Sequence, residues 1–584
     1  MSEGTTQNTT PSTTQNTTTD GWPTRLFAWS TAAWSCLHVA SIFTENINWD
    51  EFALLSRVER MVATGALQGA GRPGAIEIVL APFVRGCEDS VTALREARLL
   101  TAVATFLAIF GLYVLARRAR SDRERPSQGA WLAVALLIFA LPFQRWSLQV
   151  RTDPFGIAWG IWGAVAWLGA PRRHRNAGIA GVLFGLGFLF TQKVLYVAVL
   201  GGCLRVAHEY RNPQPKLRRL LAEAALCGGA LLAVIVAYRL LVPLFFKPPA
   251  QLRFSRALEI FASYRETFGL ALYRGMLAAL VPHLLLIAAL IAATVLALRE
   301  RKPRGHLASS WSLLGLAVVV AAFHTGMFPY FWMTLGLFPA LALGCSAEEI
   351  ARVAPPRVRR VAIGAWTACL VVPTAVYAVQ LLDDTQRIQR DALGFIAHEI
   401  GPDRHGIQLE GALACRRDPD PFQVYFRHHI EQGFYGPNAN KIPAFVERLR
   451  NKPVYFLIQS HMIGFFPEPI RRFWEENYQL YFGPVYVVGR TLPDAGTLTY
   501  DVFAPGKYRW QALDQARRSQ LQVDSLTLHD HETIVLTRGP HTLRAIGGAG
   551  RLVLSVDVDP SWVSDSFYTG AAIREIIGGS YFAR

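Results

Sequence analysis

The sequence of 584 residues has little cysteine and lacks the short motifs that identify many soluble enzymes. Its seven cysteines contain no Cys-x-x-Cys pair and no zinc-finger spacing, which argues against a disulfide framework and against a structural zinc site. Most of them fall in apolar segments, where cysteine serves as a small packing residue. The residues after Leu382 also lack a P-loop, a dinucleotide fingerprint and a nucleophile elbow. Nucleotide-dependent and serine-hydrolase chemistry are therefore not expected there.

What the sequence does have is a series of apolar blocks, each about as long as a bilayer is thick. Hydrophobic residues make up 51% of the chain, a share that globular proteins also reach, so their distribution carries the information. We predict an α-helical polytopic membrane protein with about eleven transmembrane helices. The expected spans are 24–44, 99–116, 129–145, 155–170, 179–190, 194–204, 220–245, 276–298, 311–328, 330–346 and 361–382.

The basic residues predict the orientation of these spans. The net charge of +16 comes largely from short loops at 117–125, 172–175, 211–219, 299–304 and 352–360, which all fall on one face if the spans alternate. The positive-inside rule makes that face cytoplasmic, so the charge is an orientation signal and nucleic acid is not an expected partner. We expect an integral protein of the bacterial cytoplasmic (inner) membrane, with everything after Leu382 outside the cytoplasm.

Four regions are predicted along the chain. Residues 1–23 are rich in Thr, Asn, Gln and Ser and are expected to form a disordered cytoplasmic tail. Residues 24–382 form the membrane domain. Residues 383–493 mix helix and strand patterns, which predicts a small extracytoplasmic α/β unit. Residues 494–584 alternate apolar and polar positions, as in 498–503 and 551–556, which predicts an extracytoplasmic β-sandwich-like module.

Two adjacent carboxylates, Asp50 and Glu51, follow the first expected span at the outer face. A base that takes a proton from a hydroxyl while a lipid phosphate leaves would need this position. A second interpretation is structural: Asn48 or Asp50 caps a helix that continues through Leu54 and Val58. The two interpretations are compatible.

Further charges, Arg72, Arg151, Asp153 and Lys193, also lie at the outer ends of apolar segments. Arginine and lysine at such places often extend to the lipid headgroups, and Asp153 before Pro154 suits the start of a helix. Lys193 differs, because it interrupts a run that is otherwise apolar from 177 to 204. Charges at membrane depth are usually functional, so this lysine is suited to neutralise a lipid-linked phosphate.

These features together resemble the GT-C class of polyprenyl-phosphate-dependent glycosyltransferases, nearest to the protein O-mannosyltransferases and the lipid A aminoarabinose transferases. The similarity is spread over residues 24–382. The segments that carry it are Trp49-Asp50-Glu51, Gly71-Arg72-Pro73-Gly74 followed by Leu80-Ala81-Pro82-Phe83, Arg151-Thr152-Asp153-Pro154, Phe190-Thr191-Gln192-Lys193 and, more loosely, Tyr330 to Pro339. The departures are Arg72 in place of a lysine and Gln192 inserted before Lys193.

The resemblance implies that a sugar moves from a polyprenyl-phosphate donor to an acceptor hydroxyl in one displacement, with inversion at the sugar carbon. Asp50 would be the general base and Glu51 would support it. Asp153 would orient the acceptor or help to hold a cation. The acceptor is a lipid, a glycan or a protein, and membrane lipids surround the enzyme.

The remaining candidate residues would act on the donor. Arg72, Lys193 and Arg151 would bind its phosphate and stabilise the charge that grows in the transition state. His324 and Tyr330 would line the substrate pocket. No cofactor is required by any motif, and a divalent metal fits among the carboxylates although no ligand spacing demands one.

Two other classes of function compete with the enzyme. A flippase for a lipid-linked sugar would be expected to show repeated halves, broken helices and ionisable groups near the membrane centre. The sequence shows no internal repeat, and its charges gather at one face, which favours the enzyme. A structural or sensory protein whose outer domain binds a partner is the third interpretation.

Overall fold

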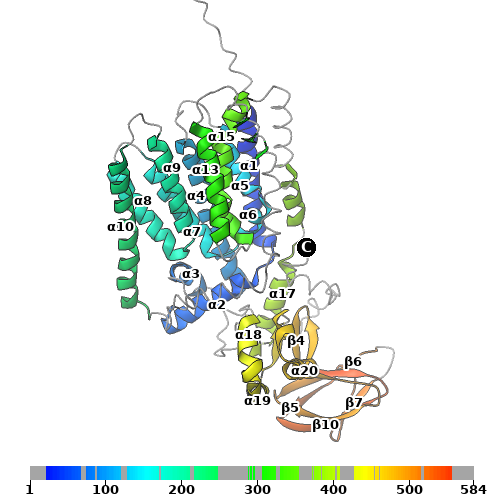
Figure 1. Cartoon of the computed structure of the whole chain (residues 1–584). Coiled ribbons are helices and arrows are strands. Elements are labelled where there is room, and N and C mark those ends of the chain that lie inside the picture. The colour runs from blue at the N-terminus through cyan, green and yellow to red at the C-terminus, as the bar shows by residue number, and fades with distance from the viewer. Residues whose placement is uncertain are drawn as a thin grey trace, which may run out of the picture.

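The structure is a computed structural model, and Figure 1 shows a bundle of helices with a β-rich domain at one end. It describes residues 22–67, 74–85, 89–119, 128–169, 173–210, 216–247, 305–323, 329–353, 374–382, 384–400, 404–407, 427–452, 454–458, 461–514 and 519–555, with short helical pieces between 287 and 295 and at 371–372. The expected tail at 1–23 and the expected span at 276–298 lie almost entirely outside these residues.

Helices make up the first part of the chain. They are α1 (Trp22–Thr44), α2 (Trp49–Thr64), α3 (Ala75–Arg85), α4 (Ser90–Ala119), α5 (Gln128–Ile138), α6 (Leu141–Trp146), α7 (Thr152–Trp167), α8 (Arg173–Phe190), α9 (Val194–Tyr210), α10 (Leu217–Leu241), η1 (Val242–Leu244), α13 (Gly305–Phe323), η2 (Pro329–Phe331), α14 (Trp332–Leu335) and α15 (Leu337–Val353). Among the described helices, Arg25–Thr44, Ser90–Ala119 and Leu217–Leu244 are long and apolar enough to cross a membrane. The predicted total of eleven spans stays a prediction.

Two expected spans are interrupted. The span predicted at 129–145 is divided into α5 and α6, because Pro142 starts a new helix and cannot donate a hydrogen bond to the preceding turn. The span predicted at 330–346 begins as the short helices η2 and α14 and continues, after Gly336, as α15. Both interruptions place irregular backbone near the outer ends of helices, beside the loops that carry the candidate site.

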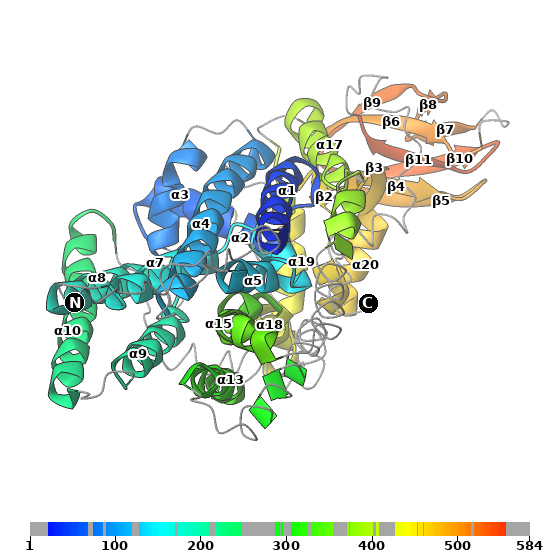
Figure 2. The same cartoon turned by 90° about the horizontal axis from the view of Figure 1, so that it is seen from above.

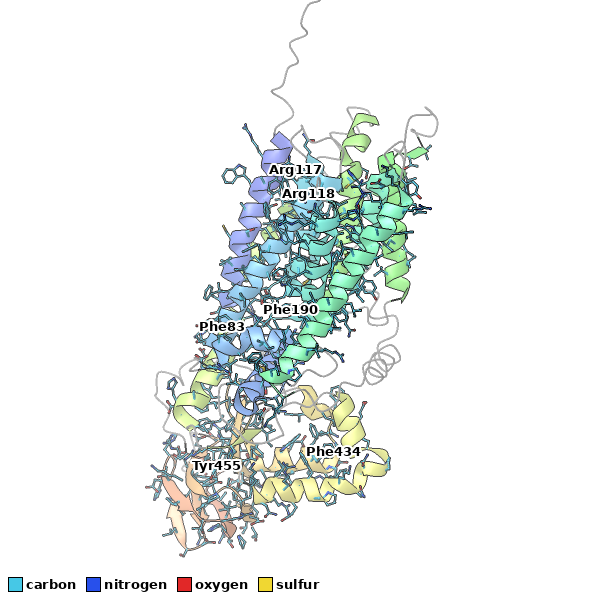
Figure 3. All side chains as sticks on the ribbon, turned by 90° about the vertical axis from the view of Figure 1, so that its left-hand side faces the viewer. Phe83, Arg117, Arg118, Phe190, Phe434 and Tyr455 are labelled. Carbon is cyan, nitrogen blue, oxygen red and sulfur yellow. The ribbon has the colours of Figure 1, made fainter. Side chains whose placement is uncertain are left out.

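The two ends of the bundle differ in chemistry. Arg117 and Arg118, in the last turn of α4, lie at the end away from the β-rich domain, whereas Phe83 and Phe190 lie at the end that faces it (Figure 3). Seen from above, α10 stands at one edge of the bundle and the β-rich domain projects beyond the opposite side, next to α17 (Arg387–Phe395) (Figure 2). The basic end of α4 and the β-rich domain thus lie at opposite ends of the bundle, and the assignment of the basic end to the cytoplasm stays a prediction.

The elements after α17, from η3 to β11, are called the outer domain, after the side of the membrane predicted for them. Its further helices are η3 (Ile396–Ile400), α18 (Arg427–Phe434), η5 (Gly436–Lys441), α19 (Ile442–Asn451), η6 (His461–Phe465) and α20 (Glu468–Asn477). Its strands are β1 (Gly406–Ile407), β2 (Phe456–Ile458), β3 (Tyr478–Phe482), β4 (Val485–Leu492), β5 (Thr497–Val502), β6 (Gly506–Ala512), β7 (Gln520–Val523), β8 (Leu526–Leu528), β9 (Thr533–Leu536), β10 (Gly539–Ile546) and β11 (Gly550–Leu554).

These strands form two sheets rather than two separate units. One sheet has the order β1-β2-β4-β11-β6-β9, with β3 also paired to β4, and the other has the order β5-β10-β7-β8. Strands on both sides of residue 494 therefore share one sheet, so the boundary expected at 493/494 is not a boundary of the sheet. Val553 of β11 pairs with Gly489 of β4, a contact between distant segments that strand patterns alone do not reveal.

The outer domain packs continuously onto the bundle. One cluster of buried apolar residues runs from Phe52 and Leu80 in α2 and α3 to Phe395 in α17 and into the β-sheets. Phe395 stacks on Phe482 and on Tyr481, with ring centroids 4.9 Å and 5.8 Å away. Burial of large aromatic side chains of this kind is among the strongest stabilising contributions in a fold.

A histidine in the outer domain lies between two hydrogen-bond acceptors. Nδ1 of His541 is 2.9 Å from Oδ2 of Asp524, and Nε2 is 3.0 Å from the carbonyl oxygen of Thr537. Both nitrogens can donate only when the ring is protonated. Burial acts to lower the pKa of His541, but its hydrogen bonds to Asp524 and Thr537 outweigh burial and raise that pKa. The contact with His541 and the N–H of Thr542 lower the pKa of Asp524.

These shifts predict a mildly acidic optimum for the stability of the outer domain. The raised pKa of His541 stabilises the fold below the unfolded value of about 6.5, and this stabilisation is lost as the pH rises through the folded value. The lowered pKa of Asp524 stabilises it above about 3.9, and this is lost at lower pH. His541→Gln should therefore reduce the resistance of the outer domain to proteolysis more at about pH 5.5 than at about pH 8.5. Equal losses at both pH values would contradict the prediction.

Candidate active site

The first outer loop ends in a capped helix. The side chain of Asn48 accepts a hydrogen bond of 3.0 Å from the N–H of Asp50, and the carboxylate of Glu51 accepts one of 2.9 Å from the N–H of Asn48. This reciprocal arrangement is a capping box, so the cap interpretation is confirmed with Asn48 as the N-cap residue. Asp50 is then the second residue of α2, and its side chain takes no part in the cap.

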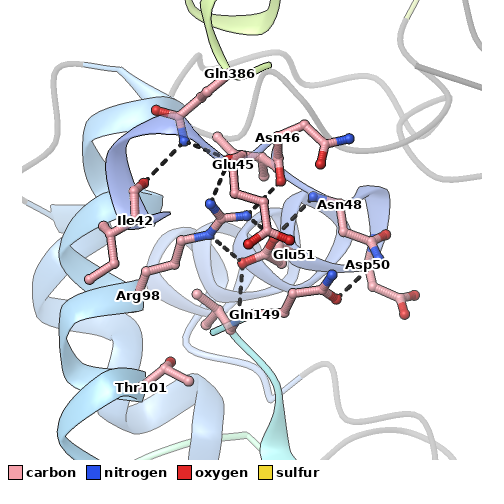
Figure 4. A network of polar contacts seen from close by, with 12 residues as sticks. Ile42, Glu45, Asn46, Asn48, Asp50, Glu51, Arg98, Thr101, Gln149 and Gln386 are labelled. Atoms are coloured by element: carbon pink, nitrogen blue, oxygen red, sulfur yellow. Dashed lines mark hydrogen bonds and ion pairs between the residues drawn. The ribbon is translucent and has the colours of Figure 1, made fainter. Parts of the chain in front are cut away.

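Glu51 is fully buried against an arginine that sequence reasoning missed (Figure 4). Arg98 of α4 donates from Nε and Nη2 to the two carboxylate oxygens, at 2.9 Å and 2.6 Å, and both side chains are 0% exposed. The N–H of Val150 also donates to Glu51, at 2.8 Å. The same guanidinium holds the carbonyl oxygens of Glu45 and Asn46, each at 2.8 Å. The buried Arg98–Glu51 ion pair therefore connects α4 to the loop before α2 and to the loop before α7.

Four charged side chains form a row in which the sign of the charge alternates. They are Asp50 in the first turn of α2, Arg151 before α7, Asp153 in the first turn of α7 and Lys193 in the α8–α9 turn. Nη1 of Arg151 lies 2.5 Å from Oδ2 of Asp50, and Nε of Arg151 lies 4.0 Å from Oδ2 of Asp153. Nζ of Lys193 lies 2.9 Å from Oδ1 of Asp153, and Thr191 donates to the same oxygen at 3.3 Å. The structure thus brings together four of the residues that the sequence singled out.

Aromatic rings cover the two cations of this row. The ring of Tyr330 lies 3.9 Å from the guanidinium carbon of Arg151 and 4.4 Å from Nζ of Lys193. Trp146 approaches the same guanidinium at 5.2 Å, and Phe331 approaches Lys193 at 5.7 Å. Cations placed over aromatic faces are stabilised where water is scarce. Tyr330 therefore contacts both cations of the row, and it was one of the two residues expected in the substrate pocket.

Exposure differs sharply along the row. The side chain of Asp50 is 30% exposed, whereas those of Arg151, Asp153 and Lys193 are 10%, 4% and 15% exposed. Asp50 is thus the most exposed member of the row, and the two cations are less exposed. The row as a whole is neutral, with two carboxylates and two cations, so a bound anion would compete with the carboxylates for the cations.

Two other expected site residues and a metal ion were also predicted. Arg72 and His324 lie outside the described residues. Within the part of the chain that the structure describes, no group of three or more His, Cys, Asp or Glu side chains is arranged to hold a metal ion. The divalent metal that the sequence allows among the carboxylates stays a prediction.

The Arg98–Glu51 pair should dominate the stability of this region. Arg98→Gln leaves a buried carboxylate without its cation, which usually costs about 3 to 5 kcal/mol. Arg117→Gln removes an exposed arginine from the other end of the same helix and should change stability by less than about 0.5 kcal/mol. Thermal unfolding of the purified protein in detergent measures both. Equal effects of the two substitutions would contradict the role given to Arg98.

Comparison with known proteins places this site within a known fold. No protein-family model and no curated protein matches the sequence. Among solved structures, ArnT from Cupriavidus metallidurans bound to undecaprenyl phosphate matches with a TM-score of 0.53 and 14% identity, over 80% of this chain and 98% of that chain. ArnT in the apo state gives 0.52 and 14%, over 80% and 97%.

The oligosaccharyltransferase AglB from Archaeoglobus fulgidus matches less well. Its TM-score is 0.45 and its identity is 12%, over 90% of this chain and 94% of that chain. At such identities a structural match concerns the fold and not the substrate. The predicted resemblance is confirmed at that level: the chain is an integral membrane protein with the fold of the GT-C glycosyltransferases.

Proposed function

We propose that the protein is a membrane glycosyltransferase that moves a sugar from a polyprenyl-phosphate donor to an acceptor hydroxyl on the outer side of the membrane. The observation that carries this proposal is the row of alternating charges, in which a partly exposed carboxylate, Asp50, lies in one row with two largely buried cations. The match to ArnT, a protein solved with undecaprenyl phosphate, supports a lipid-phosphate donor.

The proposed reaction is a single displacement that inverts the sugar carbon. The acceptor oxygen forms a bond to that carbon while the bond from the carbon to the phosphate oxygen breaks, and the hydroxyl proton passes to Asp50. A carboxylate is a suitable base if it lies close to the hydroxyl, and Asp50 is the most exposed carboxylate of the row. The electron pair of the broken bond leaves with the lipid phosphate.

The cations of the row are suited to hold that phosphate. Arg151 pairs with Asp50 and Lys193 pairs with Asp153, and each cation would give part of its interaction with a carboxylate to the incoming anion. Stabilisation of charge that develops on a leaving group is often the largest contribution to such catalysis. The ring of Tyr330 would keep the two cations at their present spacing. Arg72 stays a proposed third phosphate ligand from the sequence.

The other acidic residues have supporting roles in this proposal. Asp153 accepts from Lys193 and Thr191, and so would hold Lys193 in place and orient the acceptor. Glu51 is enclosed by Arg98 and cannot meet a substrate, so it would support Asp50 by fixing the start of α2. The outer domain would select or dock the acceptor.

The proposal predicts that Asp50→Asn abolishes transfer. General-base catalysis is worth about 10²- to 10⁴-fold, and asparagine cannot take the proton. Membranes in which the protein is expressed supply the acceptor hydroxyl, and after addition of a panel of undecaprenyl-phosphate sugars they should release undecaprenyl phosphate only with the native carboxylate. Asp89→Asn is the matched control, because Asp89 caps α4 at the same face and asparagine caps equally well. Transfer at the native rate by the Asp50→Asn protein would remove Asp50 from the mechanism.

A second substitution tests the phosphate site. Lys193→Ala should weaken binding of undecaprenyl phosphate about tenfold or more, since a hydrogen bond to a charged group contributes about 1.5 to 3 kcal/mol. It should slow transfer as well. Lys247→Ala removes an exposed side chain and keeps the backbone hydrogen bonds of residue 247 to Gly65 and Leu67, so it should change neither quantity. Binding is measured by tryptophan fluorescence, and native affinity in the Lys193→Ala protein would refute its role.

A further inference from the structure

The loop before Asp50 is held by a segment far away in the sequence. Oε1 of Gln389 accepts a hydrogen bond of 2.6 Å from the N–H of Ile47, and Nε2 of Gln389 donates one of 2.7 Å to the carbonyl oxygen of Ile47. One side-chain amide thus pairs with both polar groups of one residue, as a neighbouring β-strand would. Ile47 and Gln389 are 2% and 9% exposed, so little water can replace these bonds.

A threonine of the same segment holds the preceding part of the loop. Oγ1 of Thr385 accepts from the N–H of Asn46 at 3.0 Å and donates to the carbonyl oxygen of Thr44 at 3.2 Å. The hydroxyl therefore uses its donor and an acceptor lone pair on two loop residues at once. A valine has the same shape and can do neither.

Gln386, which lies between Thr385 and Gln389, extends the contact to α4. Its Nε2 donates to the carbonyl oxygens of Ile42 and Glu45, at 3.3 Å and 3.2 Å (Figure 4). Its Oε1 accepts from Nε of Arg95 in α4 at 2.7 Å. Its backbone N–H donates to the carbonyl oxygen of Thr44 at 3.0 Å. Gln386 is 0% exposed. The backbone from 42 to 47 is thus bound repeatedly by residues 385–389.

These contacts lead directly to Asp50. Ile47 is followed by Asn48, whose side chain accepts from the N–H of Asp50, so a displaced Ile47 would displace the cap and the first turn of α2. Arg98 holds the same loop from the side of α4, through the carbonyl oxygens of Glu45 and Asn46. The loop is therefore fixed between α4 on one side and residues 385–389 on the other.

The helix that contains Gln389 also contacts the outer domain. Gln389 belongs to the first turn of α17, which continues without a break into η3. Phe395, at the end of α17, stacks on Phe482 and Tyr481 of β3. Gln389 and Phe395 are six residues apart on one helix, about 9 Å along its axis. A movement of β3 against the bundle would thus reach Ile47 through one rigid element.

We propose that residues 385–389 position Asp50 for proton transfer and make its position depend on the docking of the outer domain. Gln389 and Thr385 are positioning residues in this scheme, because they act on Asp50 through Ile47 and Asn46. The scheme rests on the proposed role of Asp50 as general base. An acceptor bound by the outer domain would then influence the base that must receive its proton.

Three substitutions and one control test the scheme. Gln389→Leu and Thr385→Val keep the size of the side chain and remove its hydrogen bonds, whereas Thr385→Ser keeps the hydroxyl. Arg390→Gln is the control, since Arg390 lies on the same helix and forms ion pairs with Asp384 and Asp391, outside the loop. Each protein is the full chain, in lipid nanodiscs for hydrogen exchange and binding and in expressing membranes, which supply the acceptor, for transfer.

Three readouts separate positioning from general loss of structure. Hydrogen exchange of peptides covering residues 43–52 should become faster in Gln389→Leu and Thr385→Val, while peptides from α7 and the β-sheets stay protected. Release of undecaprenyl phosphate from its sugar conjugates should slow about 10- to 100-fold, because a displacement of the reacting groups by about 1 Å has such an effect. The affinity for undecaprenyl phosphate itself should not change. Thr385→Ser and Arg390→Gln should match the native protein in all three.

The outcomes distinguish this inference from the proposed function. Native exchange and native transfer in Gln389→Leu and Thr385→Val, with transfer lost in Asp50→Asn, would overturn the positioning scheme and leave the base intact. Faster exchange throughout the chain, or loss of undecaprenyl-phosphate binding together with transfer, would show a merely structural role and would also overturn it. Full activity of Asp50→Asn would overturn the proposed function, whereas the exchange of residues 43–52 would still report whether residues 385–389 hold the loop.

Discussion

The buried carboxylate of Glu51 is the constraint on which the outer end of the bundle depends. An ionised carboxylate removed from water is very costly unless donors surround it, and here the guanidinium of Arg98 and the N–H groups of Asn48 and Val150 do so. Those donors come from α4, from the start of α2 and from the loop before α7. Satisfying one charge therefore fixes the relative positions of three segments that each carry or support a site residue.

Two adjacent carboxylates thus differ because their surroundings differ. Glu51 is enclosed, saturated with donors and out of reach of any substrate, whereas Asp50 is 30% exposed and pairs with Arg151. Separation of neighbouring acids by environment is a common way to give one of them a chemical task and the other a structural one. In the same way Asp153, at 4% exposure, is held by Lys193 and Thr191 and faces the interior of the site.

The sequence predicted features that depend on local pattern and missed those that depend on distant partners. Apolar blocks, basic loops and the cap at Asn48 follow from short-range spacing, and the break at Pro142 was also within reach, since proline interrupts a helix wherever it lies. Arg98 stood one residue before the expected span at 99–116, and its depth in the first turns of α4 was a signal that it has a buried partner. Gln386 and Gln389 gave no such signal, because glutamine in an amphipathic helix usually faces water.

The sheet of the outer domain and the loop before Asp50 are connected through α17. β4 pairs with β2, β3 and β11, so the strands next to α17 cannot shift without the rest of the outer domain. α17 in turn contacts the loop through Gln389 and the sheet through Phe395. Packed cores and buried hydrogen bonds transmit displacement instead of absorbing it. In the proposed scheme, a domain joined by a flexible linker could only bring an acceptor near the site, whereas one joined in this way would also set the position of Asp50.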